Sequence, residues 1–173
     1  MVIKIFYFVI SIFSVAMVYL TIQDPYHTQS IKPDNSIASM KINDVIDYEL
    51  NSTIINARYE ADEWNKYSDK DEFLSFKAEI IKDNKEHNLT SDKAFYQNDT
   101  LKFKGNVDYI SSDGLKFVSD EVVYDIKSKL AVSDTSFVMT QNGDKVVGDA
   151  LVYDANLKRT YVKGIRAWIE EKR

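Results

Sequence analysis

The chain has no cysteine, only two prolines and five glycines, and no cluster of lysine and arginine. Without cysteine, disulfides, thiolate catalysis and cysteine-ligated zinc are excluded. The scarcity of proline and glycine, together with 45% hydrophobic and 13% aromatic residues, is typical of a folded chain. A net charge of −5 without a basic cluster argues against nucleic acid as a partner. At 173 residues, the chain has room for one ordinary domain.

One long hydrophobic run stands at the N-terminus. Residues 5–22 read IFYFVISIFSVAMVYLTI, with no charge between Lys4 and Asp24. A helix of this length covers roughly 27 Å, close to the hydrocarbon thickness of a bilayer. Because the positive charge precedes the run, the positive-inside rule places the N-terminus in the cytoplasm. We therefore predict a single transmembrane anchor within residues 1–22.

A cleaved signal peptide is the alternative interpretation of this segment. Ser14-Val15-Ala16 has the small-x-small pattern of a cleavage site. Apolar residues continue to Ile22, however, so that cleavage there would leave an apolar stub on the mature protein. This favours an uncleaved anchor.

The remaining chain divides into a linker and a β domain. Residues 23–41 contain both prolines and no apolar period, which predicts an extended linker. From residue 42 to 173 we predict one antiparallel, almost wholly β domain. Apolar and polar residues alternate most clearly in residues 101–109, and again in 55–61 and 74–80. Turn signals at residues 112–114 and 142–144 separate such runs.

An internal repeat supports this prediction. The segments LTSDKAFY, FVSDEVVYD and VVGDALVYD begin at residues 89, 117 and 146, and define repeats at about 89–116, 117–145 and 146–169. Gly105-Asn106-Val107 follows the first segment and Gly164 the third, whereas Asp134 stands near the corresponding place in the middle repeat. Stacked hairpins of this kind share one continuous interior. An elongated, rolled or V-shaped sheet is the expected result.

The pattern Ser-Asp-x-Ala-x-Tyr followed by Gly-Asn-Val resembles the OstA-like β-jellyroll of the lipopolysaccharide transport proteins. The short chain and the N-terminal helix resemble the LptC family within this group. The resemblance implies an inner-membrane protein with its C-terminal domain in the periplasm. It also implies that the domain accepts lipopolysaccharide from the ABC transporter complex of LptB, LptF and LptG and passes it to LptA.

An apolar groove can hold acyl chains without specific chemistry, because burial of apolar area is favourable by roughly 25 cal/mol per Å². Inward apolar residues more often fill a closed core, so the lipid hypothesis rests on the set and not on single positions. The candidates for the lining of the groove are Phe76, Ala78, Ala94, Tyr96, Phe103, Val107, Tyr109, Val122, Tyr124, Leu151 and Tyr153.

Open sheet edges are candidates for strand addition by partners. We expect the C-terminal strand, about residues 159–169, to receive LptA, and the first strand, near residues 43–50, to meet the transporter. The candidate residues of the C-terminal edge are Tyr161, Lys163, Ile165, Arg166 and Trp168.

No residue set predicts catalysis, a metal or a cofactor. Asp92, Asp120 and Asp149 recur at equivalent repeat positions, as structural residues do, and His27 and His87 lie in polar stretches without a partner nucleophile. The acidic residues of 60–63 are interpreted as a solvated strand end. Two other functions remain open at this point: an anchored scaffold without a ligand, and a soluble shuttle like LptA. An enzyme has the least support.

Overall fold

A computed structural model of the chain describes residues 13, 17–19, 37–50 and 55–169. The chain divides into two units, Met1–Asp34 and Asn35–Arg173. In the first unit, Phe13 and residues 17–19 are helical. Within the described residues, no helix is long and apolar enough to cross a membrane. The predicted anchor falls almost entirely outside these residues, as does most of the predicted linker.

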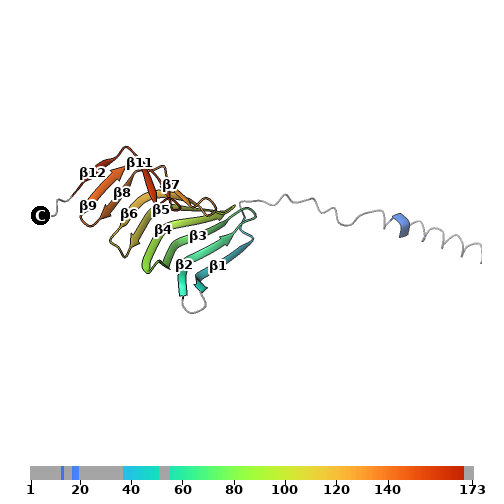
Figure 1. Cartoon of the computed structure of the whole chain (residues 1–173). Helices are drawn as coiled ribbons and strands as arrows, with labels where there is room; N and C mark the ends of the chain where they lie inside the picture. Colours follow the sequence, from blue (N-terminus) through green and yellow to red (C-terminus); the bar gives the residue numbers. More distant parts are fainter. Residues whose placement is uncertain (1–12, 14–16, 20–36, 51–54, 170–173) are drawn as a thin grey trace, which may run out of the picture. The chain divides into compact units, whose positions relative to one another are not determined.

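The second unit is a single antiparallel sheet of twelve strands (Figure 1). This confirms the predicted all-β, antiparallel architecture. The strands are β1 (Met40–Leu50), β2 (Ile55–Lys66), β3 (Asp71–Lys82), β4 (Lys85–Gln97), β5 (Thr100–Ser111), β6 (Lys116–Asp125), β7 (Leu130–Ser133), β8 (Phe137–Gln141), β9 (Asp144–Gly148), β10 (Ala150–Asp154), β11 (Arg159–Lys163) and β12 (Arg166–Trp168).

The first six strands form a meander in which each strand pairs with the next. Beyond β6, each long strand is replaced by two short ones. Strand β6 pairs with β7 through residues 123–125 and with β8 through residues 116–119. Strand β10 pairs with β7, and β9 pairs with β8. Strand β11 then pairs with β10, and β12 pairs with β9. The sheet therefore keeps two halves along its whole length.

The interruptions lie at one level across the sheet, which we call the crease. Ladder pairing is interrupted there between Asn43 and Val45 of β1, between Leu74 and Phe76 of β3, and between Lys104 and Val107 of β5. The residues of the crease are Asp44, Asp62, Ser75, Asp92, Gly105, Asn106, Asp120, Asp134, Thr135, Ser136, Asp149, Gly164 and Ile165.

Two kinds of residue alternate along the crease. Asp44, Ser75 and Gly105 have φ angles of 54°, 53° and 79°, and Gly164 has 67°, all in the left-handed region. The intervening strands carry Asp62, Asp92, Asp120 and Asp149 at the same level. A left-handed residue shifts the backbone out of regular pleating, as in a β-bulge, so the strand bends at that point. The repeated motif of the sequence is thus the motif that bends the sheet.

The two repeats with glycine show why glycine is required. A Cβ at Gly105 would lie against Asp92 Oδ2 and 3.0 Å from Asp92 Cβ, and a Cβ at Gly164 would lie against Asp149 Oδ2. Asn106 Nδ2 also donates a hydrogen bond of 2.9 Å to Asp92 Oδ2. The aspartate side chain occupies the space that the missing side chain leaves.

The middle repeat, which has Asp134 instead of glycine, bends by a different arrangement. Strand β7 ends at Ser133 and β8 begins at Phe137, so three residues leave the ladder. The Ser119 hydroxyl lies 2.8 Å from both the Ser133 and the Thr135 hydroxyl oxygens, and Ser119 and Ser133 are buried. A hydroxyl network and a strand break replace the aspartate–glycine contact.

The crease is convex toward solvent, because its aspartates are exposed while their neighbours Ser91, Ser119 and Gly148 are buried. Phe103 and Val107, on either side of the bulge in β5, belong to one buried cluster. In a regular strand these residues would be about 13 Å apart. The bend therefore closes the two halves toward one another on the inner face.

We call the two halves of the bent sheet the near arm and the far arm. The near arm runs from the crease to the turns at residues 67–70, 98–99, 126–129 and 155–158, and the far arm runs to the turns at 83–84, 112–115 and 142–143. The chain enters the sheet on the near arm, where Met40 pairs with Lys66.

Candidate functional site

The inner face is tightly filled beside the crease. On the far arm, the cross-strand row next to the crease alternates large and small side chains, through Val107, Ser119, Phe137 and Gly148. A Cβ at Gly148 would lie only 2.6 Å from the Phe137 ring, so the row has no spare room. The matching row on the near arm contains the buried Ala94, Phe103, Ser133 and Leu151.

Away from the crease, the same face keeps accessible surface from β4 to β10. The next row outward on the far arm pairs apolar residues across five strands, and none of them is buried: Leu89, Tyr109, Phe117, Met139 and Val146. The corresponding row on the near arm is also not buried: Tyr96, Leu101, Tyr124, Ala131 and Tyr153. We call this apolar inner face, which is buried beside the crease and keeps accessible surface nearer the turns, the trough.

Aromatic side chains line the trough around β2, β3 and β5. The rings of Phe76 and Phe103 have centroids 5.6 Å apart, and Phe73 and Phe76 are 6.1 Å apart. Trp64 stacks on Phe73 at 5.9 Å, and Tyr59 lies 6.5 Å from Phe76. Offset and tilted aromatic pairs of this kind form a large, rigid apolar surface.

All eleven residues predicted to line the groove lie on this face. Directly opposed residues in antiparallel strands share a face, and the register joins Ala78 to Leu89 and Tyr109, and Ala94 to Phe103 and Val122. Ala78, Ala94, Phe103, Val107 and Leu151 are buried, so they form the floor. Phe76, Tyr96, Tyr109, Val122, Tyr124 and Tyr153 keep accessible surface.

Sequence reasoning missed part of the lining. Leu89, Leu101, Phe117, Met139 and Val146 lie on the same face. On β4, the inner residues are Leu89 and Ser91 before Asp92, but Ala94 and Tyr96 after it, because the crease reverses the alternation. The aspartate of each repeat marks the point where the phase changes, and this signal was available in the sequence.

A fourth repeat was also missed. Asp62 lies at the crease 30 residues before Asp92, after the buried Ala61, as Asp92 follows the buried Ser91. The acidic residues of 60–63 are therefore not one cluster. Asp62 belongs to the crease, whereas Glu60 forms an ion pair with Arg58 and Glu63 with Lys41. Lys66 stands where the other repeats have tyrosine, so the sequence pattern did not reveal this unit.

The far arm carries polar groups at its outer margin. His87 Nδ1 and Tyr109 Oη are 2.6 Å apart, and the two rings stack with centroids 6.0 Å apart. Burial raises the pKa of Tyr109. In the adjacent turns, Lys85 Nζ lies 2.7 Å from Asp113 Oδ2, and this hydrogen bond lowers the pKa of Asp113 to about 2.

The residues considered as metal ligands or catalytic groups are widely separated in the part of the chain that the structure describes. In the described ranges, no group of three or more histidine, aspartate or glutamate side chains is placed to hold a metal. The repeat aspartates lie on the convex side of the crease, where Asp92 lies beside Gly105 and Asn106 and Asp149 lies beside Gly164. His87 contacts a tyrosine, and His27 lies outside the described residues.

The two margins of the sheet are β1 and the pair β11 and β12. The predicted C-terminal strand is divided in two at Gly164 and Ile165. The side chains of Tyr161, Ile165 and Trp168 are all more than half exposed, and Lys145 Nζ lies 5.9 Å from the Trp168 ring centroid. Within the described residues, each margin pairs with the sheet on one side only.

The fold defines a class: an all-β, antiparallel, jellyroll-like sheet with an apolar inner face. The family model "Lipopolysaccharide-assembly, LptC-related" matches residues 6–168. The chain belongs to this family, which confirms the resemblance seen in the sequence. A comparison with curated proteins gave no match.

Among solved structures, the chain is similar to LptH from Pseudomonas aeruginosa, described as the LptA-homologous periplasmic component of the lipopolysaccharide transport device. The identity is 12% and the TM-score 0.44, with 80% of this chain and 99% of that chain covered.

Proposed function

We propose that this chain is a non-enzymatic, membrane-anchored carrier that holds lipopolysaccharide by its acyl chains in the apolar trough. Its N-terminal segment would span the inner membrane and its β domain would lie in the periplasm. Membership of the LptC-related family supports a role in lipopolysaccharide assembly. The proposal depends mainly on the pattern of burial on the inner face: from β4 to β10, most residues beside the crease are buried, whereas the apolar residues of the next rows keep accessible surface.

This pattern of burial supports a trough over a closed core. Interiors of folded domains pack to high density, so apolar rows on both arms would be buried if the arms met along their length. Leu101 and Tyr124 of the near arm and Phe117 of the far arm keep accessible surface. Acyl chains placed there would remove this surface from water at roughly 25 cal/mol per Å².

A photoreactive amino acid at Tyr124, introduced in cells, tests the proposal. The matched control is Val123, the adjacent residue, whose side chain points to the outer face because strand neighbours alternate. We expect a lipopolysaccharide adduct at position 124 and little at 123. An anchored scaffold without a ligand would give no adduct at either position.

The sheet margins support a direction of transfer. We propose that LptA adds to the margin formed by β11 and β12, and that the transporter complex of LptB, LptF and LptG meets β1. Strand addition needs an unpaired edge, and both margins have one within the described residues.

Photoreactive residues at Arg166 and Trp168 should capture LptA, whereas residues 43–50 should capture the transporter. Capture of LptA confined to residues 43–50 would reverse the assignment. Because Arg166 and Trp168 are exposed, we expect these substitutions to leave the fold intact.

A further inference from the structure

Strand β1 has an inverted polarity on the far arm. Its inner-face residues there are Asp47 and Glu49, because they lie directly opposite Tyr59 and the buried Ala57 of β2. The residues that alternate with them point to the convex face. Those residues are apolar and exposed: Ile46, Tyr48 and Leu50. The far-arm end of β1 therefore presents carboxylates to the trough and apolar side chains to the outside.

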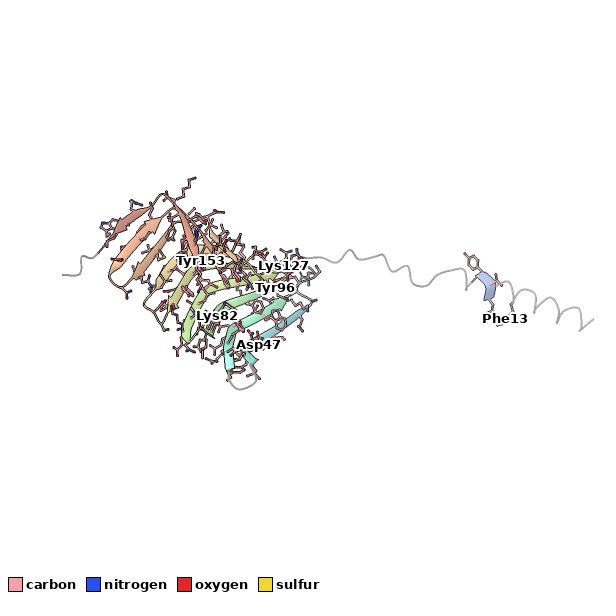
Figure 2. All side chains as sticks on the ribbon, viewed as in Figure 1. Phe13, Asp47, Lys82, Tyr96, Lys127 and Tyr153 are labelled. Atoms are coloured by element: carbon pink, nitrogen blue, oxygen red, sulfur yellow. The ribbon has the colours of Figure 1, made fainter. Side chains whose placement is uncertain are left out.

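We call Asp47, Glu49 and Tyr59 the acidic corner. Tyr59 Oη donates a hydrogen bond of 3.4 Å to Glu49 Oε2, and its ring centroid lies 6.5 Å from that of Phe76 in the trough. Burial raises the pKa of Tyr59, and Glu49 and Asp47 raise it further. Figure 2 shows Asp47 at the β1 margin of the sheet, whereas Tyr153 belongs to the C-terminal strands. Two carboxylates thus border the far arm where the sheet ends.

The near arm is different at the same margin. Its row beside the crease runs from β1 to β5 through Ile42, Trp64, Phe73, Ala94 and Phe103, with each residue directly opposite the next. Every member of this row is apolar, and Trp64 stacks on Phe73 with centroids 5.9 Å apart. An apolar path therefore leads from the β1 edge to the buried cluster around Phe103.

This path is narrow at β1. In the next row of the near arm, Met40 lies opposite Lys66, and Lys66 lies opposite Asp71. In the middle of β1, the apolar inner-face residues are Ile42 and Val45, one on either side of the crease. The β1 margin thus has an apolar entrance beside the crease, with charged groups farther out on both arms.

The opposite margin of the sheet has no such restriction. There the near-arm row ends in Leu151 and Val162, and a far-arm row ends in Val146 and Ala167, with each pair directly opposed. None of these four side chains is charged. The acidic corner is therefore a feature of the β1 margin, where the proposed transfer begins.

Inward-pointing charges also protect edge strands from aggregation. That role by itself does not account for their placement, since Met40 and Ile42, on the near-arm part of the same edge strand, are apolar. An acyl chain that covered Asp47 or Glu49 would remove their hydration without supplying a hydrogen bond, which is unfavourable. The same chain over Ile42 would bury apolar area, which is favourable.

We propose that acyl chains cross the β1 margin over Ile42 and Trp64, beside the crease on the near arm, and that the acidic corner closes the far arm at this margin. The inference rests on the proposed function, because it specifies where along β1 the carried lipid enters. From β4 onward, apolar rows lie on both arms, so the chains spread over both after entry. Asp47 and Glu49 thus select the path without binding the ligand.

A carboxylate placed in this path tests the proposal. Ile42 and Ile46 lie on the same strand and are 38% and 52% exposed, so aspartate at either position should leave the fold intact. Ile42→Asp changes the inner face, whereas the matched control, Ile46→Asp, changes the convex face. Each variant of the full chain carries a photoreactive amino acid at Tyr124 in cells, and the adducts are normalised to the amount of the chain in the membrane.

We expect the lipopolysaccharide adduct at position 124 to fall by roughly fivefold or more in Ile42→Asp, because the added carboxylate must lose hydration as the lipid passes. In Ile46→Asp the adduct should stay near the wild-type level.

A second comparison locates the path directly. Trp64 and Tyr59 are both aromatic, both on β2 and both partly exposed, but Trp64 belongs to the near-arm row and Tyr59 to the acidic corner. A photoreactive amino acid should give a stronger lipopolysaccharide adduct at position 64 than at position 59.

Removing the charges of the acidic corner should open the far arm. In the double variant Asp47→Leu with Glu49→Met, the adduct at position 59 should rise toward that at position 64. The control, Glu79→Met with Glu86→Met, removes the same charge from exposed positions on the convex face of the far arm. It should leave the adduct at position 59 unchanged.

The outcomes separate the path from the carrier itself. A wild-type adduct at position 124 that persists in Ile42→Asp, or equal adducts at positions 59 and 64, would overturn the path and leave the proposed carrier standing. Absence of an adduct at position 124 in the wild type would overturn the proposed function and the path together. Loss of the adduct in Ile42→Asp but not in Ile46→Asp supports both.

Discussion

Gly105 shows how a single residue sets the bend of the sheet. Its φ of 79° and its contact with Asp92 leave no room for a side chain. We expect Gly105→Ala to destabilise the domain by about 1–3 kcal/mol, because both the left-handed backbone and the clash oppose alanine. Urea unfolding of the full chain in a mild detergent measures this.

The double variant Gly105→Ala with Asp92→Ala separates the two causes. Removing the Asp92 side chain relieves the clash but not the backbone strain. Its free energy of unfolding should therefore exceed the value expected from adding the two single effects. Strict additivity would show that the aspartate contact contributes nothing at this position.

The Lys85–Asp113 pair predicts a dependence of stability on pH. Its hydrogen bond lowers the pKa of Asp113 from 3.8 to about 2. A carboxyl whose pKa is lower in the folded state stabilises the fold above the unfolded pKa, and this contribution is lost as the pH falls from about 4 through 2. The melting temperature of Lys85→Gln should therefore lie below that of the wild type at pH 6, and the difference should shrink toward pH 2. A difference that stays constant with pH would contradict this origin.

At the scale of elements, the middle repeat depends on hydroxyl groups that join β6, β7 and the break before β8. Ser119→Val would remove the hydroxyl shared by Ser133 and Thr135 and place a branched side chain in a full row. We expect a loss of about 2 kcal/mol in the free energy of unfolding, since buried hydroxyl groups would lose their partner.

The control for this variant is Ser128→Ala. Ser128 is exposed in the turn between β6 and β7, where it contacts Asp125, so its replacement should cost clearly less. Equal losses from the two variants would show that the network adds no specific stability.

The division of long strands into pairs also belongs to this scale. The sequence analysis predicted one C-terminal strand over about residues 159–169. The structure breaks it at Gly164, because Asp149 occupies the space beside that glycine. Alternation alone cannot reveal such a break, since it depends on a contact with the neighbouring strand.

At the scale of the whole molecule, the N-terminal segment determines whether the β domain stays at the membrane or is released from it. We predict that the mature protein retains residues 1–22 and stays in the membrane fraction after an alkaline wash, because a run of this length is sufficient to span a bilayer. Membrane fractionation with N-terminal sequencing of the product checks this. A soluble product beginning near Met17 would instead indicate a shuttle like LptA.

The sequence by itself determined the antiparallel β class, the repeat, the inner-face residues of most strands and the family. These features are local: alternation, turn residues and repeat spacing are each visible within a few residues of the chain. Residues such as Ala94, Phe103 and Tyr153 could be placed on one face because each follows a recognisable aspartate or alternation.

Only the tertiary structure decided where the sheet bends, and which inner-face residues are buried and which keep accessible surface. These depend on contacts between residues far apart in the sequence, such as Asp149 with Gly164 or His87 with Tyr109. The reversal of alternation at each aspartate carries this information in principle, but its meaning requires the register of the neighbouring strands.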